Sequence, residues 1–288
     1  MRRTMLAALV FTGGTIAAAL SPATVHADEW SKTYTVTGRA DLRVGTDDGD
    51  VTIVSSDQKQ IDAHVTTEGY KIGPNDVRIE EHQDGDHVVL NVKLPRINWS
   101  WLGGRHHSVH IDVHVPRDLD LDVHTGDGNV SAQSVAGRIR IDTGDGHVNA
   151  TGLKGEVNMH SGDGHITASG LDGSLMVDTG DGPINVDGRF DALNLRTGDG
   201  NIEARVMNGS KVGSSWRLHS GDGRINVSLP SDLNADLEAH TGDGHITLDV
   251  PISVSGSLSR SSIHGKLNGG GGSVSITSGD GSIHVQKL

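Results

Sequence analysis

The tetrapeptide Ser/Thr-Gly-Asp-Gly recurs along the chain, and five of its copies follow one another at intervals of 18 residues. Stacked copies would place their carboxylates one above another, where each pair repels by about 1 kcal/mol or more. Backbone hydrogen bonds or a bound Ca²⁺ would relieve that repulsion. The alternative is a purely structural corner: glycine supplies positive φ, Asp bonds its own backbone and the hydroxyl satisfies a corner amide. The aspartates concerned are Asp127, Asp145, Asp163, Asp181 and Asp199.

Two copies of the tetrapeptide are bracketed by histidines, which could bind a transition metal, although nothing in the sequence specifies a third ligand. These histidines are His160, His165, His240 and His245. The residues immediately before successive tetrapeptides alternate between base and acid, and such alternation keeps like charges apart on neighbouring strands. This favours a stabilising role for these side chains. The alternating residues are His124, Asp142, His160, Asp178 and Arg196.

Residues 107–115 alternate between polar and apolar types, which predicts a half-buried strand. His110 and His114 share its polar face and could bind zinc if Asp122 or His106 supplied a third ligand. The alternative is a solvated strand face.

A Trp-x-Trp motif stands out in a chain with only 3% aromatic residues. Trp99 and Trp101 could stack on a sugar or dock on a partner protein, because their rings combine a large apolar surface with a polar edge. The alternative is a hairpin folded over the core.

The residues around each tetrapeptide predict a strand, a turn and a second strand, because they alternate with period two. One copy has Ile139 and Ile141 before the turn and Val148 and Ala150 after it. A further apolar residue, such as Val135, would close the repeat on a short third side. Eighteen residues cannot hold a crossover helix, so successive repeats must stack as parallel strands. We therefore expect an all-β fold, a single-stranded parallel β-helix (solenoid) with rungs of about 18 residues and right-handed winding.

The chain divides into three predicted segments. Residues 1–27 read as a secretory signal peptide, with Arg2-Arg3, an apolar stretch and an A-x-A-like cleavage site. Residues 28–118 contain strand-like runs that are expected to cap and pair with the solenoid. Residues 119–288 hold the β-helix repeats.

The last part of the repeat array is irregular. The interval between the last two tetrapeptides is 37 residues, which predicts one degenerate copy between them. The strands around residues 274–285 then form a last rung without a cap. An open edge of that kind could pair with another chain, so we expect end-to-end self-association.

Composition excludes several classes of protein. The chain of 288 residues has 37 Asp and Glu against 24 Lys and Arg, so a nucleic-acid partner is not expected. It has no cysteine, which excludes disulfides and thiolate metal sites, and its 40 glycines argue against an ordinary helical enzyme. No transmembrane segment follows the signal. The product is therefore expected to be secreted, periplasmic or on the cell surface.

The phrase from Ile111 to Gly128, which is echoed from Ile225 to Gly244, resembles the bacterial putative-adhesin domain of unknown function. Members of that family are exported β-strand repeat proteins with Gly-Asp-Gly turns. The resemblance covers about residues 41–288 and implies a β-helical fold and a surface or adhesion role. It supplies no catalytic or binding residues.

These observations favour an exported, non-enzymatic interaction protein of the cell envelope. Its partner would be an envelope component, a polysaccharide or a protein, and no cofactor is expected apart from the Ca²⁺ already considered. One alternative is a surface protein that responds to cations or to pH, because the chain has 17 histidines. Another is a carbohydrate-active β-helix enzyme, which is disfavoured because the Asp and Glu residues are spread evenly.

Overall fold

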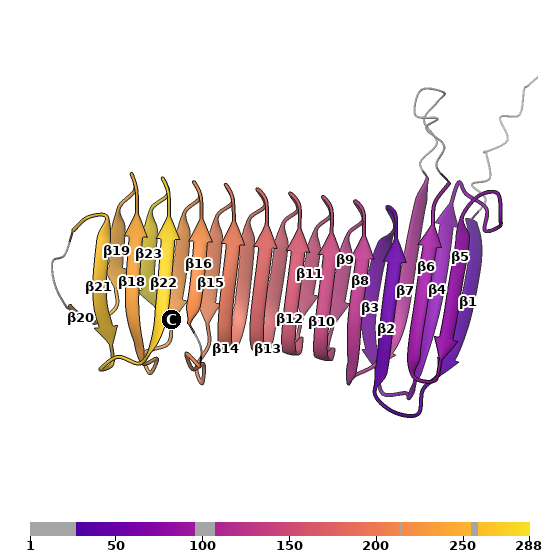
Figure 1. Ribbon diagram of the computed structural model, residues 1–288, viewed down its shortest axis with the longest axis horizontal. Coiled ribbons are helices and arrows are strands. Elements are labelled where there is room, and N and C mark those ends of the chain that lie inside the picture. The colour runs from indigo at the N-terminus through magenta and orange to yellow at the C-terminus, as the bar shows by residue number, and fades with distance from the viewer. Residues whose placement is uncertain (1–26, 96–106, 214, 255–258) are drawn as a thin grey trace, which may run out of the picture.

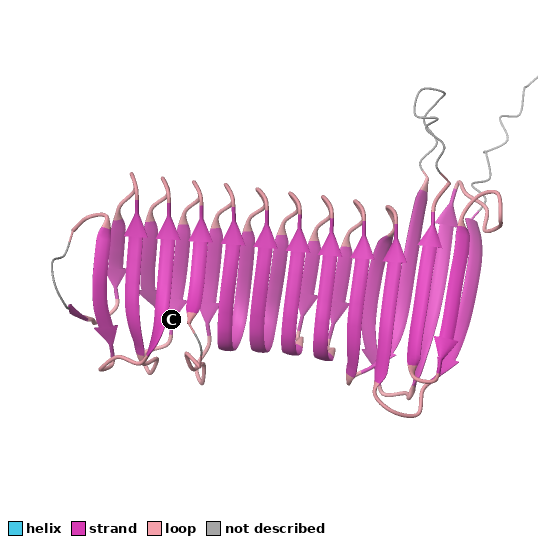
Figure 2. Ribbon diagram, viewed as in Figure 1, coloured by secondary structure: helices cyan, strands magenta, loops and turns pink. Residues whose placement is uncertain are grey.

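The computed structural model describes residues 27–95, 107–213, 215–254 and 259–288, and all regular structure in these ranges is β-strand (Figure 1, Figure 2). The all-β prediction is confirmed. The described ranges contain no helix that could span a bilayer. Residues 1–26 of the predicted signal, His106, Trp99 and Trp101 lie outside the described residues.

Strands of successive repeats pair in parallel and form two walls, which the Gly-Asp-Gly turns join. In the first wall Ile141 lies between Val123 and Met159, its equivalents in the neighbouring rungs. In the second wall Val148 lies beside Val130 and Ile166 in the same way. The first wall contains β8 (Leu119–Thr125), β10 (Ala136–Thr143), β12 (Lys154–Ser161) and the second halves of β13 (Ile166–Thr179) and β14 (Ile184–Thr197). The second wall contains β9 (Val130–Gln133), β11 (Val148–Thr151), the first halves of β13 and β14, and β15 (Ile202–Val206).

The core lies between the two walls and consists of the apolar positions predicted from the repeat. Ile139, Ile141, Val148 and Ala150 are at most 1% exposed. Val135 and its equivalents Leu153 and Leu171 are buried at the corner away from the Gly-Asp-Gly turns. Strands β13 and β14 run continuously through this corner, so those rungs have no separate third side.

At the N-terminal end the order of rungs in space differs from their order in the chain. The first rung, β2 (Ala40–Thr46) and β3 (Asp50–Ser56), lies between the β8–β9 rung and the pair β6 (His87–Lys93) and β7 (Ser108–Pro116). Three antiparallel strands complete this end. Strand β4 (Gln60–Glu68) pairs with β7 and with β1 (Ala27–Thr35), and β5 (Arg78–Asp84) pairs with β6.

At the C-terminal end the last strands of the chain are inserted between two earlier rungs. Strand β22 (Gly272–Ser278) lies between β16 (Trp216–Ser220) and β18 (Ala235–Thr241), as Figure 1 shows. Strand β23 (Ile283–Lys287) lies between β17 (Ile225–Leu229) and β19 (Ile246–Asp249). The expectation of an open last rung is therefore wrong, because β22 and β23 are each paired on both sides.

The long interval before the last tetrapeptide contains a reversal of the chain, so the predicted degenerate repeat is also wrong. Strand β21 (Ser262–Leu267) runs antiparallel to β18 and to β20 (Ser253–Val254). The turn that follows has positive φ at Asn268, Gly269 and Gly270, which glycine and asparagine adopt readily. This turn returns the chain to the position between β16 and β18.

Candidate functional site in the turns and strand faces

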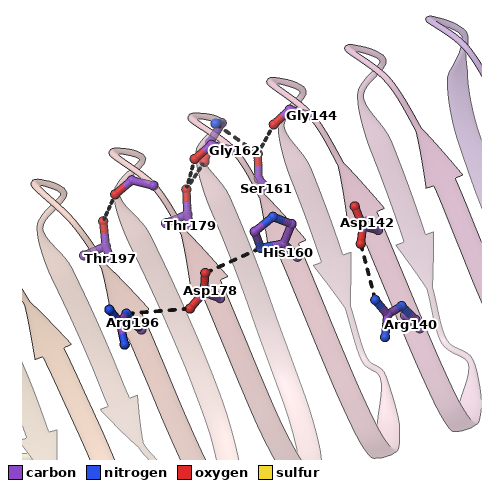
Figure 3. A network of polar contacts seen from close by, with 12 residues as sticks. Arg140, Asp142, Gly144, His160, Ser161, Gly162, Asp178, Thr179, Arg196 and Thr197 are labelled. Atoms are coloured by element: carbon purple, nitrogen blue, oxygen red, sulfur yellow. Dashed lines mark hydrogen bonds and ion pairs between the residues drawn. The ribbon is translucent and has the colours of Figure 1, made fainter.

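The Ser or Thr of each tetrapeptide forms a buried ladder of hydrogen bonds along the turns. Ser161 Oγ accepts a hydrogen bond from the Gly164 amide at 2.9 Å and donates one to the Gly146 carbonyl of the preceding rung at 3.0 Å. Thr197 forms the same pair of bonds two rungs further on. Figure 3 shows further bonds of this kind, from Ser161 to the Gly144 carbonyl and from Thr179 to the Gly162 carbonyl. The predicted bond to a corner amide is confirmed, and the same hydroxyl also ties its rung to the preceding one.

The glycines of the tetrapeptide are required by the close approach of neighbouring turns. A Cβ atom on Gly164 would lie 1.9 Å from the carbonyl oxygen of Gly146, and one on Gly162 would lie 2.6 Å from that of Gly144. None of the described tetrapeptide glycines has positive φ. The expectation of positive φ is therefore wrong, and the physical reason for glycine is the backbone of the preceding rung.

The five repeated aspartates lie in the turns, and all five side chains are exposed. Each of the first four carboxylates lies next to the first glycine of the following turn: Asp145 Oδ1, for example, would be 3.0 Å from a Cβ on Gly162. Within the described ranges these carboxylates accept no hydrogen bond, so the expected bond from Asp to its own backbone is missing. Calcium binding by Asp127, Asp145, Asp163, Asp181 and Asp199 stays a prediction.

The two histidines that bracket a turn belong to opposite walls. His160 is the next-to-last residue of β12 in the first wall, and its Nδ1 is 3.5 Å from Asp178 Oδ1. His165 precedes the second-wall part of β13, and its Nε2 is 3.1 Å from Asn185 Nδ2. His240 and His245 are separated in the same way.

The histidines of β7 also lie apart from one another. His110 and His114 are exposed on the same face, but four residues along a strand span about 13 Å, too far for one metal ion to bridge. His110 Nδ1 is 3.5 Å from Asp50 Oδ2. Asp122 belongs to β8 in the other wall. Among the residues that the structure describes, no group of three His, Asp or Glu side chains has the arrangement of a metal site.

The alternating charges before the turns form a continuous row on the first wall. Asp142 is in register with His124 and His160, and Asp178 is in register with His160 and Arg196. His124 Nδ1 is 3.6 Å from Asp142 Oδ1. Arg196 Nε is 3.9 Å from Asp178 Oδ2, a contact that Figure 3 shows. The predicted alternation is confirmed up to Arg196.

Beyond Arg196 the alternation stops, because His219 follows it in register. A shallow depression of about 480 Å³ lies at this point of the first wall. This site was not predicted from the sequence, although the sequence already shows that the alternation of base and acid ends at Arg196. Its outward-facing lining residues are Met176, Asp178, Asn194, Arg196, Arg217, His219, Ser275 and Thr277.

Ion pairs at the end of the first wall that is remote from the Gly-Asp-Gly turns join neighbouring rungs. Asp120 accepts hydrogen bonds from Arg138 at 2.8 Å and from Arg39 at 2.7 Å, and the Arg138 guanidinium lowers the pKa of Asp120. Arg189 pairs with both Asp172 and Asp191 and lowers the pKa of Asp191. Asp120 and Asp191 therefore stay ionised to more acidic pH than an ordinary carboxyl group.

Comparison with known proteins agrees with the resemblance seen in the sequence. A solved structure described as a "putative lipid binding protein" from Parabacteroides distasonis is 16% identical, with a TM-score of 0.52 over 90% of this chain and 96% of that one. Another, described as a "putative adhesin" from the same species, is 13% identical, with a TM-score of 0.52 over 89% of this chain and 96% of that one. At these identities the likeness shows the fold alone. No curated protein matches the sequence.

A family model described as Toastrack DUF4097 matches residues 39–286. This range contains both walls of the solenoid and the two inserted rungs. The predicted membership of a putative-adhesin family of unknown function is confirmed. The chain belongs to the Toastrack DUF4097 family.

Proposed function

We propose that this protein is an exported, non-enzymatic interaction protein that binds an envelope polysaccharide or protein through its strand faces. The observation that carries the proposal is the regular exposure of polar side chains on both walls, rung after rung, while the apolar positions of the repeat are buried. Such a surface suits extended contact with a polymer. The solved structure described as a "putative adhesin" supports a surface role.

A non-enzymatic role is supported by the distribution of the carboxylates. The turn aspartates are placed one per rung, and Asp120, Asp172 and Asp191 are engaged by arginines. A glycoside hydrolase needs one particular pair of carboxyl groups on either side of a sugar, whereas the turn aspartates repeat from rung to rung without such a local exception. The proposal includes three further points. The solenoid winds right-handed, residues 28–118 cap it, and the signal is cleaved after residue 27.

The test is binding of the purified full chain to envelope fractions and to a polysaccharide array. We expect retention on at least one of them, and weaker retention after Trp99→Ala with Trp101→Ala. Mass spectrometry of the exported protein should give an N-terminus at Asp28. Failure to bind either material would contradict the proposal.

A pH-responsive surface is the second candidate, because histidines contact carboxylates on neighbouring strands throughout the molecule. Protonation of these imidazoles would convert neutral contacts into ion pairs. Electrophoretic mobility and light scattering from pH 8 to pH 5 measure the response, and an unchanged assembly state would exclude this candidate. The contacts are His64–Glu29, His87–Asp41, His110–Asp50, His124–Asp142, His160–Asp178 and His284–Asp249.

A further inference from the structure

The insertion of β22 separates Arg217 from the acidic residue that chain order would place beside it. Stacked in chain order, the rung of β18 would place Glu238 next to Arg217. In the structure Arg217 lies between Asn194 and Ser275, and Glu238 lies on the far side of Ser275. His219 lies between Arg196 and Thr277.

The result is a local excess of positive charge in an acidic protein, whose formal net charge is -13. Asp178 is the one carboxylate among the described residues that line the depression, and it already contacts Arg196 at 3.9 Å and His160 at 3.5 Å. Arg217 and His219 form no ion pair within the described ranges. Like charges on neighbouring strands are destabilising, so an anion at this position would relieve repulsion.

An anion that occupied this position would come from outside this chain. The segments that the structure does not describe, residues 1–26, 96–106, 214 and 255–258, contain no Asp or Glu. Every carboxylate side chain of the protein is therefore among the described residues, and Asp178 alone of them lines the depression.

The shape and chemistry of the depression favour a sugar polymer as the source of the anion. Ser275, Thr277 and Asn194 offer hydroxyl and amide groups, and Met176 is 50% exposed beside them. Sugar rings present hydroxyls together with apolar C–H groups, which match this mixture. The depression is open on the surface of the wall, so a long chain can cross it without entering an enclosed pocket.

We propose that Arg196, Arg217 and His219 bind the carboxylate groups of an acidic polysaccharide that lies across β14, β16 and β22. This inference rests on the proposed role in surface binding and names the class of partner and the place where it binds. Arg217 forms charge-assisted hydrogen bonds to a uronate carboxylate, Arg196 adds a second cation, and His219 contributes a further charge when protonated. The hydroxyls of Ser275 and Thr277 bond to sugar hydroxyls.

Calorimetric titration of the full chain with polygalacturonate, at low and high salt, tests this site. We expect binding that weakens as salt rises, and affinity about tenfold lower in Arg217→Gln, since a hydrogen bond to a charged group contributes about that factor. Ser275→Asp places a carboxylate next to Arg217 and should abolish binding without loss of folding. Arg224→Gln is the matched control, because Arg224 is exposed directly before β17, on the other side of the turn from Arg217.

Three further probes test the class of partner. Dextran is a neutral polysaccharide, and polyglutamate and vesicles of phosphatidylglycerol are the other sources of an anion. Tighter binding to any of these than to polygalacturonate would overturn the assignment to an acidic polysaccharide. Equal affinities of Arg217→Gln and the unaltered protein for polygalacturonate would overturn the site alone and leave the proposed function standing. Failure of the unaltered protein to bind any polysaccharide or envelope fraction would remove the proposed function as well.

Discussion

At the scale of single residues, the turns depend on the absence of side chains where two backbones approach. The second glycine of each tetrapeptide faces the carbonyl group of the preceding turn. A Cβ atom added to this glycine would lie 2.0 Å from that carbonyl oxygen at Gly146 and 1.9 Å from it at Gly164. The hydroxyl ladder and the glycines therefore act together: the hydroxyl draws two turns close, and glycine permits the approach.

Gly164→Ala should lower the free energy of unfolding by about 1–3 kcal/mol, because the neighbouring turn must move to admit the methyl group. Denaturant titration measures the change. Gly73→Ala is the control, since nothing lies within 4 Å of an added Cβ there, and it should change stability by less than about 0.5 kcal/mol. Equal stabilities of the two variants would show that the close approach does not constrain the turn.

A second ladder begins just after the turns and was not evident from the sequence. Asp50 Oδ1 accepts a hydrogen bond from the Asn129 amide, Asn129 Oδ1 from the His147 amide and His147 Nδ1 from the His165 amide, at 2.8, 3.0 and 3.0 Å. A backbone amide can only donate, so Nδ1 of His147 is the acceptor of this hydrogen bond. The ladder ends at Pro183, the equivalent residue of the next rung, which has no amide hydrogen. Asp, Asn and His can all hold this position because each side chain offers a hydrogen-bond acceptor to the amide of the next rung.

At the scale of elements, salt bridges join strands that belong to different rungs. Asp120 in β8 accepts from Arg138 in β10 and from Arg39, which immediately precedes β2. The lowered pKa of Asp120 means that the unfolded chain binds its proton more readily than the folded one. The stability from this carboxylate is therefore present above about pH 4 and is lost as the pH falls toward the lowered pKa.

Asp120→Asn should lower Tm at pH 7 by about 2–4 °C and reduce the decline of Tm between pH 5 and pH 2. The expected loss is only about 1 kcal/mol, because both arginines are more than half exposed. Calorimetric melting across this pH range measures both effects. Asp232→Asn, an exposed carboxylate of the turn after β17, is the control. A variant with unchanged acid dependence would rule out Asp120 as a source of the decline.

At the scale of the whole molecule, a rung at each end lies out of chain order. The rung of β2 and β3 lies on the solenoid side of the pair β6 and β7. The rung of β22 and β23 lies on the solenoid side of the rung of β18 and β19. Reversing strands accompany both insertions: β4 and β5 at one end and β21 at the other. The end strands are therefore paired with segments distant in the chain.

Removal of residues 272–288 should unfold the segment from β18 to β21 as well, because these strands would lose their parallel partner on the solenoid side. Hydrogen exchange should then show lost protection in residues 235–267, where a solenoid stacked in chain order would lose only its last rung. Removal of Lys287 and Leu288 alone, which are exposed, is the control. Full protection of residues 235–267 after the longer truncation would contradict the interleaved order.

The sequence by itself determined the all-β class, the two strands of each rung, the buried positions and the alternating row of charges up to Arg196. These features are local or repeat at a fixed spacing, so period-two alternation and the 18-residue interval are sufficient to find them. Only the tertiary structure decided which rungs are neighbours at the two ends. Every rung presents nearly the same aliphatic frame to its neighbours, so the residues of a strand do not specify its partner. The reversing strands make that choice, and it is the choice that leaves Arg217 beside Ser275 instead of Glu238.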